Sequence, residues 1–552
     1  MSTLDLRPPE VVMRLARLGA AQPSRLSFLR VLMRRAARER WRVRRACFEL
    51  NDCGFGRAVY AVETPRRVYS LVAFSTPLED EHRTDRVIAR AWDSSYVLYD
   101  GLPDTDEVVR LNATAPLQEA GRFTQRDLVL ARANKSVRLF QIVVDALARG
   151  EQPGEEQLAN VGYFMRTTAV YGNGKFGIAD RDEIASRPEL AGPFQAEMLT
   201  VWLIRSFTFD LADHIASRRN PGGAARLAPR LRRILGVGNA TGLGMAPFLA
   251  RHPVLIHNWF FARETALARV RALPRAAERE RNAFARALDD MRSRVARWRS
   301  ADPRQSAAIA ALRADLEALT REAPAILNRQ ARPWDAVYRL AEERLSLEGQ
   351  EACVSLLLEP HGAAIDDLAK TMNADESVGY SIGGRMTCAA LSALIENRYA
   401  WARRIDFCDP AANARFWYVS AEKLEPRLGQ RFEEDGSERE QPLATARDAV
   451  ALSAALQAEP AETNVANFLL RRPEWRHVVR RAQIVAKFPY AEIYDNLIGA
   501  DLRPVDLLRA KLAFFGALNF DPRSDRWLRI ALFAGEPLIE EIGVDAALGE
   551  AA

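Results

Sequence analysis

Glycine-rich segments of this 552-residue chain contain residue types that bind anions and transfer protons. The first, residues 161–182, reads VGYFMRTTAVYGNGKFGIADRD. Glycines at this density allow positive φ angles and a close approach of a ligand to the backbone. The segment therefore predicts a ligand-binding loop, and the alternative is a glycine-rich turn that caps a helix. We predict Tyr171 and Lys175 as catalytic residues that transfer a proton. The substrate-binding residues predicted here are Arg166, Thr167, Thr168 and Asn173.

Lys175 is an uncommon residue in this chain, because only six of the 78 Lys and Arg residues are lysines. In a chain that uses arginine almost everywhere, a remaining lysine marks a position where a compact, titratable amine suits better than a guanidinium. Lys135 belongs to the same small group. We expect RANKSVRLF to be helical, with Arg132, Lys135 and Arg138 along one side. Lys135 is predicted to contact the substrate, and the alternative is a solvated basic surface.

The second glycine-rich segment, residues 235–253, reads LGVGNATGLGMAPFLARHP. It predicts a flexible loop before a helix, and the amides at a helix N-terminus suit a phosphate or carboxylate. Asn239 and Thr241 are the predicted substrate contacts. His257 follows on the helix and is predicted as a catalytic acid or base, with a histidine satisfied in the core as the alternative.

The third segment, ESVGYSIGGRMTC at residues 376–388, adds Arg385 as a substrate-binding residue. Its alternative role is a turn at the start of a helix. The five cysteines are widely spaced, and no metal-ligand motif is present in the sequence. The residues before the second loop, ARLAPRLRRIL, look helical, whereas a dinucleotide site needs a preceding buried strand. We therefore predict neither a metal nor a cofactor.

The secondary structure that the sequence patterns indicate around these residues is that of a mainly helical α+β protein with a small antiparallel β portion. FELNDCGFGRAVYAVETPRRVYSLVAFS predicts two or three antiparallel strands, and RVIARAWDSSYVLYDG predicts another. Residues 260–345 predict a long helical hairpin broken at Pro274 and Pro303. ARFWYVS predicts a late strand. The predicted domains are 1–125 with a basic helix and a small sheet, 126–350 with the loops and the hairpin, and 351–552, which is helical with a short strand.

Composition is typical of a soluble globular protein, with 48% hydrophobic and 27% charged residues. The sequence lacks an apolar run of about 18 residues and a signal-peptide pattern at its start, so we predict a cytoplasmic protein with no membrane contact. Residues 24–46 predict an arginine-rich helix with an inward apolar side. The alternative is a docking surface for nucleic acid or acidic partners.

Together these patterns favour an enzyme of the lyase or isomerase type, acting on an anionic small metabolite by metal-independent acid/base chemistry. The glycine-rich loops would have to meet around one carboxylate or phosphate. The alternative is a non-enzymatic helical scaffold that binds nucleic acid or protein through the arginine-rich helix. A homo-oligomer is compatible with the long hairpin.

Overall fold

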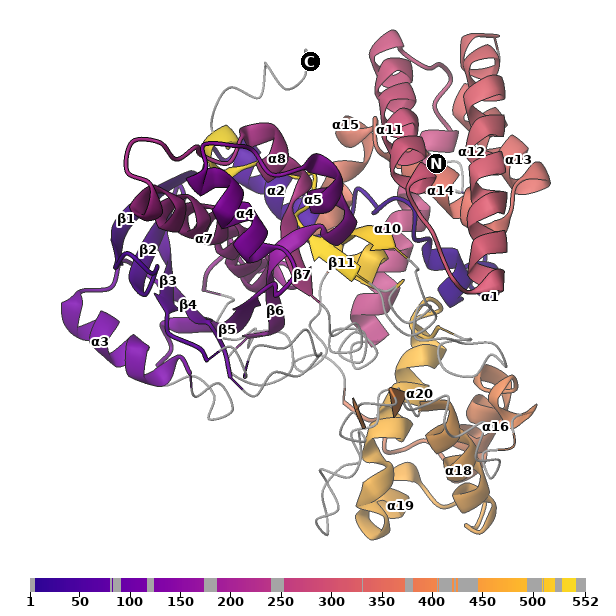
Figure 1. The fold of residues 1–552 in the computed structure, drawn as a ribbon. Coiled ribbons are helices and arrows are strands. Elements are labelled where there is room, and N and C mark those ends of the chain that lie inside the picture. The colour runs from indigo at the N-terminus through magenta and orange to yellow at the C-terminus, as the bar shows by residue number, and fades with distance from the viewer. Residues whose placement is uncertain are drawn as a thin grey trace.

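A large twisted sheet and a column of long helices stand side by side, with a smaller helical cluster below the column (Figure 1). The fold is taken from a computed structural model. The residues that it describes are 5–79, 82, 91–116, 124–172, 186–239, 253–329, 331–372, 381–404, 406, 419–420, 423–424, 445–493, 509, 511–521 and 529–542.

The sheet has nine strands in the order β1-β2-β3-β4-β5-β6-β7-β11-β10. All neighbours are antiparallel except β6 and β7, which are parallel. The expectation of a small antiparallel β portion is therefore wrong, because the sheet is large and mixed. The strands are β1 (Arg42–Leu50), β2 (Gly56–Glu63), β3 (Val68–Ser75), β4 (Ser94–Asp100), β5 (Asp127–Lys135), β6 (Tyr163–Gly172), β7 (Gly236–Asn239), β10 (Leu518–Asp521) and β11 (Arg529–Leu532).

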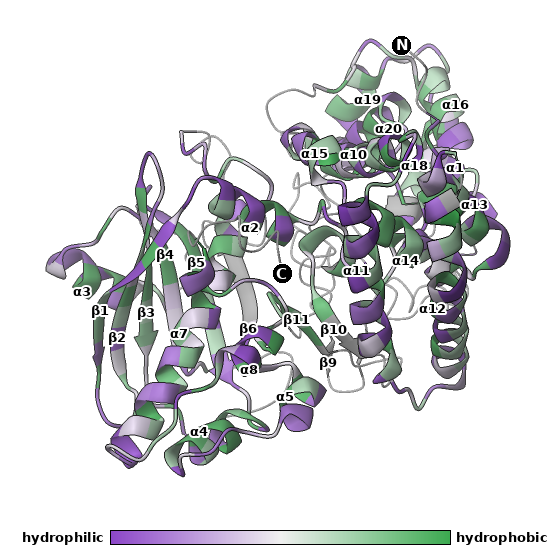
Figure 2. Cartoon of the chain, turned by 90° about the horizontal axis from the view of Figure 1, so that it is seen from above, coloured by the Kyte–Doolittle hydropathy of each residue, from purple (hydrophilic) through white to green (hydrophobic). Residues whose placement is uncertain are grey.

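The central strands are apolar because helices cover both of their faces. Helix α7 (Gln195–Arg219) packs against β3 to β7 on one face and is itself covered by α2 (Phe28–Arg38) and α4 (Phe140–Ala148). Helix α3 (Thr105–Thr114) covers the opposite face with a separate apolar cluster that includes Val72, Val97 and Leu130. We call this opposite face the outer face. Figure 2 shows hydrophobic stretches on these strands and on the helices.

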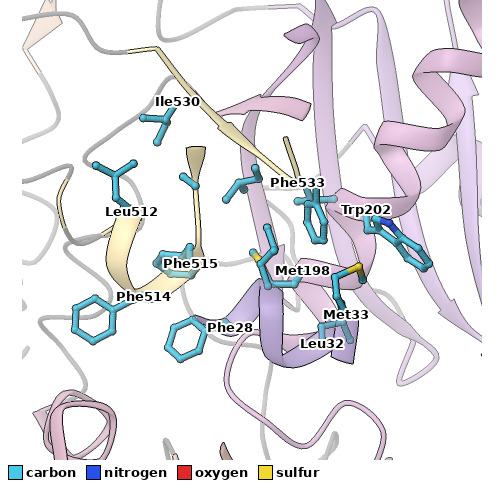
Figure 3. Packing of buried hydrophobic residues seen from close by; sticks show 14 of the residues in the cluster. Phe28, Leu32, Met33, Met198, Trp202, Leu512, Phe514, Phe515, Ile530 and Phe533 are labelled. Atoms are coloured by element: carbon cyan, nitrogen blue, oxygen red, sulfur yellow. The ribbon is translucent and has the colours of Figure 1, made fainter. Parts of the chain in front are cut away.

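The C-terminal segment returns to the sheet and completes it beyond β7. Phe514 and Phe515 pack with Phe28 and Phe194, and Figure 3 shows the aromatic cluster between the C-terminal segment, α2 and α7. The buried Arg205 guanidinium on α7 fixes the same junction by donating to main-chain carbonyls. Its acceptors, at 2.7–3.2 Å, belong to Arg232, Arg233, Leu235, Glu536 and Pro537.

The helical column is attached to the sheet through one continuous hydrophobic core. Within it α11 and α12 lie side by side, and Pro274 and Pro303 fall between α10 and α11 and at the start of α12. Arg7 joins the N-terminal segment to the column through bidentate contacts with the buried carboxylates of Glu264 and Glu351. The helices of the column are α10 (Pro253–Arg271), α11 (Glu278–Ala296), α12 (Pro303–Arg329), α13 (Pro333–Arg344), α14 (Leu347–Leu358) and α15 (Gly362–Ile365).

The smaller helical cluster has a hydrophobic core of its own. A small group of apolar residues, Ile484, Val485 and Ala491 with Val254, connects its last helix to α10. The helices of this cluster are α16 (Cys388–Arg398), α18 (Thr445–Gln457), α19 (Val465–Arg471) and α20 (Arg476–Lys487).

Several segments differ from the sequence-based expectation. The first four residues of RANKSVRLF form the end of strand β5 and not a helix. Arg132 and Lys135 therefore lie on opposite faces of the sheet. The arginine-rich helix ends at Arg38, and the chain then enters β1. The sheet takes strands from all three predicted domains, so the divisions at residues 125 and 350 both separate strands of one sheet. Of the late strand ARFWYVS, only residues 419–420 fall within the described residues.

Candidate functional site

The outer face of the sheet changes from apolar to polar along β5. Leu130 belongs to the apolar cluster under α3, and the next two residues on that face are Arg132 and Asn134. Both are only 3% exposed. Polar side chains at this depth cost free energy unless hydrogen bonds and opposite charges compensate them. Arg132 and Asn134 therefore form a buried polar patch beside the apolar cluster under α3.

Asp93, just before β4, organises the polar end of β5 through backbone and side-chain contacts. Its backbone N–H donates to Asn134 Oδ1 at 2.8 Å, and its Oδ2 accepts from the backbone N–H of Lys135 at 3.0 Å. Lys135 Nζ lies 3.8 Å from Asp93 Oδ1. Asn134 in turn donates to the carbonyl of Ala91 at 3.0 Å. These contacts fix the direction of each group and so preorganise the cluster.

Aromatic rings support both basic side chains of this strand. The Arg132 guanidinium carbon lies 3.9 Å from the centre of the Trp92 ring, which is the distance of direct stacking. Lys135 Nζ lies 5.5 Å from the Phe55 ring centre and 5.3 Å from that of Phe140. Lys135 therefore contacts two rings as well as the Asp93 carboxylate, and the Arg132 guanidinium stacks on Trp92.

The pairing of strand β6 with its two neighbours shifts register around its predicted site residues. Ala169 pairs with Arg132 and Thr167 pairs with Ala133, so Thr168 is an additional residue in the ladder. A second irregularity toward β7 lies between Tyr163 and Arg166. Bulges of this kind redirect side chains and are frequent beside active sites.

Between the two irregularities of β6, Arg166 is 4% exposed and pairs with Asn134 of β5 and Gly238 of β7. It therefore lies on the outer face with Asn134, where it adds a second guanidinium near Arg132. Thr167 is fully buried and donates its hydroxyl to the carbonyl of Gly238 at 3.2 Å.

Two glycines of the second predicted segment, Gly236 and Gly238, belong to β7 and serve packing. A Cβ added to Gly238 would lie 2.5 Å from the Tyr163 ring, and one added to Gly236 would lie 2.2 Å from the carbonyl oxygen of Leu532. These glycines thus allow a close approach of Tyr163 and of β11. The expectation of a flexible loop at residues 236–239 is wrong, because they form a strand between β6 and β11.

The structure places part of the predicted site on the adjacent strands β5, β6 and β7, but on two faces of the sheet. Arg166 lies on the outer face, whereas Lys135 and Thr167 lie on the face toward α7, and Thr167 pairs with the backbone of Asn239. Thr168 and Tyr171 lie further along β6. Asn173, Lys175 and Thr241 lie outside the described residues.

His257 has a different environment from the one predicted for a catalytic residue. Its Nδ1 accepts from the backbone N–H of Tyr490 at 3.1 Å, and its ring packs with Phe261, Phe488 and Tyr490. Burial lowers the pKa of His257 to about 4, so the ring is neutral near pH 7. These contacts come from α10 and from the segment after α20, and they indicate a structural acceptor.

Arg385 belongs to the smaller helical cluster and is exposed. Its segment packs on α20, where the backbone N–H of Gly383 donates to Gln483 Oε1 at 2.8 Å. The core of this cluster is separate from the core that contains β5 and β6. The structure therefore does not group Arg385 with Lys135 and Arg166 among its described contacts.

The arginines of α2 and its flanks make ion pairs within the molecule. Arg25 binds Asp366 with two contacts of 2.8 and 2.9 Å, and Arg34 lies 3.3 Å from the same carboxylate. Arg30 pairs with Glu359 at 2.6 Å and with Glu536 at 3.1 Å. These basic side chains thus connect α2 to the helical column and to the C-terminal segment.

Sequence reasoning missed Trp92, Asp93, Asn134 and Tyr163 as members of the cluster. One signal was present: RVIARAWDSSYVLYDG predicts a strand, and this segment contains Trp92 and Asp93. The pairing of that strand with β5 was not predicted, because residues 127–135 were expected to be helical.

No known protein family, curated protein or solved structure matches this chain. Among the described residues, no helix combines the length and the apolar character needed to span a bilayer. Those residues also contain no group of three or more His, Cys, Asp or Glu side chains placed to hold a metal ion.

Proposed function

We propose that this protein binds an anionic small molecule, a carboxylate or a phosphate, at the polar ends of β4 to β7. The observation that carries the proposal is that the buried side chains of Arg132, Asn134 and Arg166 lie together on the outer face of the sheet. Guanidinium groups bind carboxylates and phosphates through two parallel hydrogen bonds, and burial strengthens such contacts. An anionic ligand would compensate the positive charges of these basic side chains, in addition to the Asp93 carboxylate.

The reaction that fits this site is acid/base chemistry of the lyase or isomerase type. Cationic groups stabilise the negative charge that develops when a proton is removed beside a carboxylate. Tyr171 lies on β6, and the chain continues from this strand to Lys175, so we assign the proton transfer to these two residues. The cytoplasm is the compartment proposed for this activity.

Ligand-dependent thermal stability tests the proposal. In a thermal-shift screen of small carboxylic acids and phosphorylated metabolites, one class should raise the unfolding temperature, because a ligand at 100 times its Kd adds about 2.7 kcal/mol of stability. Arg166→Gln should weaken binding about tenfold or more, since a charged hydrogen bond contributes roughly 1.5–3 kcal/mol.

The matched control is Arg138→Gln, which removes an exposed arginine just beyond β5. It should leave the ligand-induced shift unchanged. If Arg166→Gln responds to the ligand as the wild type does, or if no acid in the screen raises the unfolding temperature, the proposed site is wrong.

Once a substrate is known, Lys175→Arg tests the catalytic assignment. The substitution keeps the positive charge but replaces a titratable amine by a group that stays protonated. We expect an unchanged unfolding temperature and the loss of turnover, measured as kcat. Unchanged turnover would remove Lys175 from the mechanism while leaving the binding site in place.

A further inference from the structure

The edge of the sheet where β1 begins carries a group of exposed arginines. Strand β1 is the outermost strand at this edge (Figure 2). Its first residue, Arg42, pairs with Glu63 at the end of β2, directly before the turn that contains Arg66. Arg42 and Arg44 are two residues apart on the strand, so they lie on the same face with about 6.6 Å between them. We call the following exposed side chains the arginine corner: Arg38, Arg40, Arg42, Arg44 and Arg66.

The two carboxylates next to the arginine corner already have partners. Glu39 accepts hydrogen bonds from Arg35 Nε and from the Trp41 indole, both at 2.9 Å. Glu63 accepts one from Arg44 Nε, also at 2.9 Å. These contacts leave the other members of the arginine corner without a close counter-charge.

Three members of the arginine corner expose their charge directly to solvent. In the described part of the chain, no carboxylate lies within 4.0 Å of Arg40, Arg42 or Arg66. Arg38 approaches Glu39 only to 3.9 Å, and its side chain is 65% exposed. The arginines of α2 differ, because they bind carboxylates of the helical column. The positive charge of the arginine corner is therefore accessible to a partner.

Arg40 occupies a backbone position that favours glycine. Its φ is 53°, in the left-handed region that a Cβ disfavours. The backbone N–H groups of Arg40 and Trp41 donate to the carbonyls of Ala37 and Ala36 at 3.1 and 2.9 Å, the pattern of a helix end that glycine usually completes. Arginine at this position costs stability, and backbone strain of this kind points to a function for the side chain.

We propose that the arginine corner binds the phosphate backbone of double-stranded nucleic acid without reading its sequence. Guanidinium groups bind phosphate oxygens through two parallel hydrogen bonds, and arginines spaced along a strand can contact successive phosphates. The neighbouring Trp41 is fully buried, so it offers no surface for stacking an unpaired base, which proteins that bind single strands usually supply. This binding goes beyond the proposed function and does not depend on the cluster on β5 and β6.

The competing explanation is that these charges only prevent β1 from pairing with the edge of another sheet. Exposed edge strands commonly carry charged side chains and bulges for this purpose, and β1 has a register shift between Arg45 and Cys47. In that case a duplex binds at the arginine corner no better than at other exposed arginines. The two explanations therefore differ in where a duplex binds.

The experiment measures binding of the full chain to a short fluorescently labelled DNA duplex by anisotropy, over a range of KCl concentrations. Unlabelled duplex and polyglutamate serve as competitors. The corner variant combines Arg40→Gly, Arg42→Gln and Arg66→Gln. The control variant lowers the net charge by the same amount through three exposed arginines on and next to α11: Arg275→Gln, Arg286→Gln and Arg297→Gln.

We expect the wild type to bind the duplex with an affinity that falls as salt rises, because each phosphate contact adds about −0.9 to the slope of log K against log salt concentration. The corner variant should bind about tenfold or more weakly, and its slope should be shallower by about 2.7, which corresponds to three lost contacts. The control variant should change the affinity by less than about twofold, since it leaves those contacts in place.

Arg40→Gly alone separates binding from folding. It should raise the unfolding temperature, because glycine suits the left-handed backbone, and it should still weaken duplex binding. A wild type that does not bind the duplex, or equal losses of affinity in the corner and control variants, overturns the proposal. Polyglutamate that displaces the labelled duplex as well as unlabelled duplex does would assign the arginine corner to an acidic protein instead, and so also overturns it.

Discussion

At the residue scale, the contact between Gly238 and Tyr163 determines how β6 and β7 meet at the candidate site. Gly238→Ala places a methyl group 2.5 Å from the Tyr163 ring, so the ring or the strand must move. We expect a loss of about 1–3 kcal/mol in the free energy of unfolding, typical of overpacking. Chemical denaturation measures this loss.

A second substitution distinguishes the clash with the Tyr163 ring from any other effect that an alanine has on strand β7. In Gly238→Ala combined with Tyr163→Ala the ring is absent, so the two effects should be less than additive by about 1 kcal/mol. The control is Gly383→Ala, where the nearest atom to the added Cβ lies at 3.5 Å. Strict additivity in the double variant would contradict the packing role given to Gly238.

His257 gives a pH dependence with a defined sign. Its pKa is about 4 in the folded protein, against about 6.5 when unfolded, so the unfolded state binds more protons between these values. Stability should therefore be complete above pH 6.5 and fall as the pH drops from 6.5 to 4. The loss should be on the order of 2 kcal/mol after partial exposure is taken into account.

His257→Asn tests the pH dependence because it retains an acceptor for the Tyr490 N–H but does not titrate. The difference in unfolding free energy between wild type and variant, measured by urea denaturation at several pH values, should narrow toward pH 4 as the wild type weakens. A constant difference between pH 4 and 7 would contradict the lowered pKa.

Sequence patterns identified some of these residues but not their arrangement. Lys135 and Arg166 were predicted from residue type and glycine density, and they lie on paired strands. The stack of Arg132 on Trp92 and the ladder irregularities around Thr168 depend on strand pairing. Pairing between distant segments leaves no local signal in residue order, so these features could not be predicted.

At the element scale, the segment 511–515 anchors the C-terminal strands to the rest of the sheet. Phe515 is fully buried, with ring centres 5.3 Å from Phe28 and 4.8 Å from Phe194. Phe515→Ala should cost about 3–5 kcal/mol of unfolding free energy, because it leaves a cavity in a closed aromatic cluster. Equilibrium denaturation measures the cost.

Leu470→Ala is the control for this substitution, since Leu470 is 81% exposed. It should change stability by no more than about 0.5 kcal/mol. A similar small effect for Phe515→Ala would mean that the C-terminal segment contributes little to the stability of the sheet.

Elements were predictable where one pattern dominated. The segments of strands β2 to β4 are rich in aromatic and β-branched residues between turn residues, and the strands predicted there are confirmed. The sequence of β5 favours a helix, because it is rich in Leu and Ala, contains one β-branched residue, Val129, and has no aromatic residue. Strands β7, β10 and β11 have four residues each, too few for any periodicity to appear.

At the scale of the whole molecule, the hydrophobic cores predict how the protein unfolds. The sheet and the helical column share one core, whereas α16 and α18 to α20 surround another. Bodies with separate cores and a small apolar contact unfold separately. Calorimetry should therefore show two transitions, with the sheet and the column melting together.

Single substitutions assign the two transitions. Phe468→Ala, in the core of the smaller cluster, should lower the temperature of one transition and leave the other unchanged. Phe515→Ala should do the reverse. One cooperative transition that both variants shift equally would show that the smaller cluster is thermodynamically part of the main body.

The chain order of the sheet has a consequence for biosynthesis. A ribosome makes β7 and then the whole of the helical column and the smaller cluster before it reaches β10 and β11. At about 5–20 residues per second, that interval lasts tens of seconds. During this time the nascent protein presents β7 with a neighbour on one side only. Prematurely terminated products keep that open edge permanently, which makes them substrates for aggregation or for chaperones.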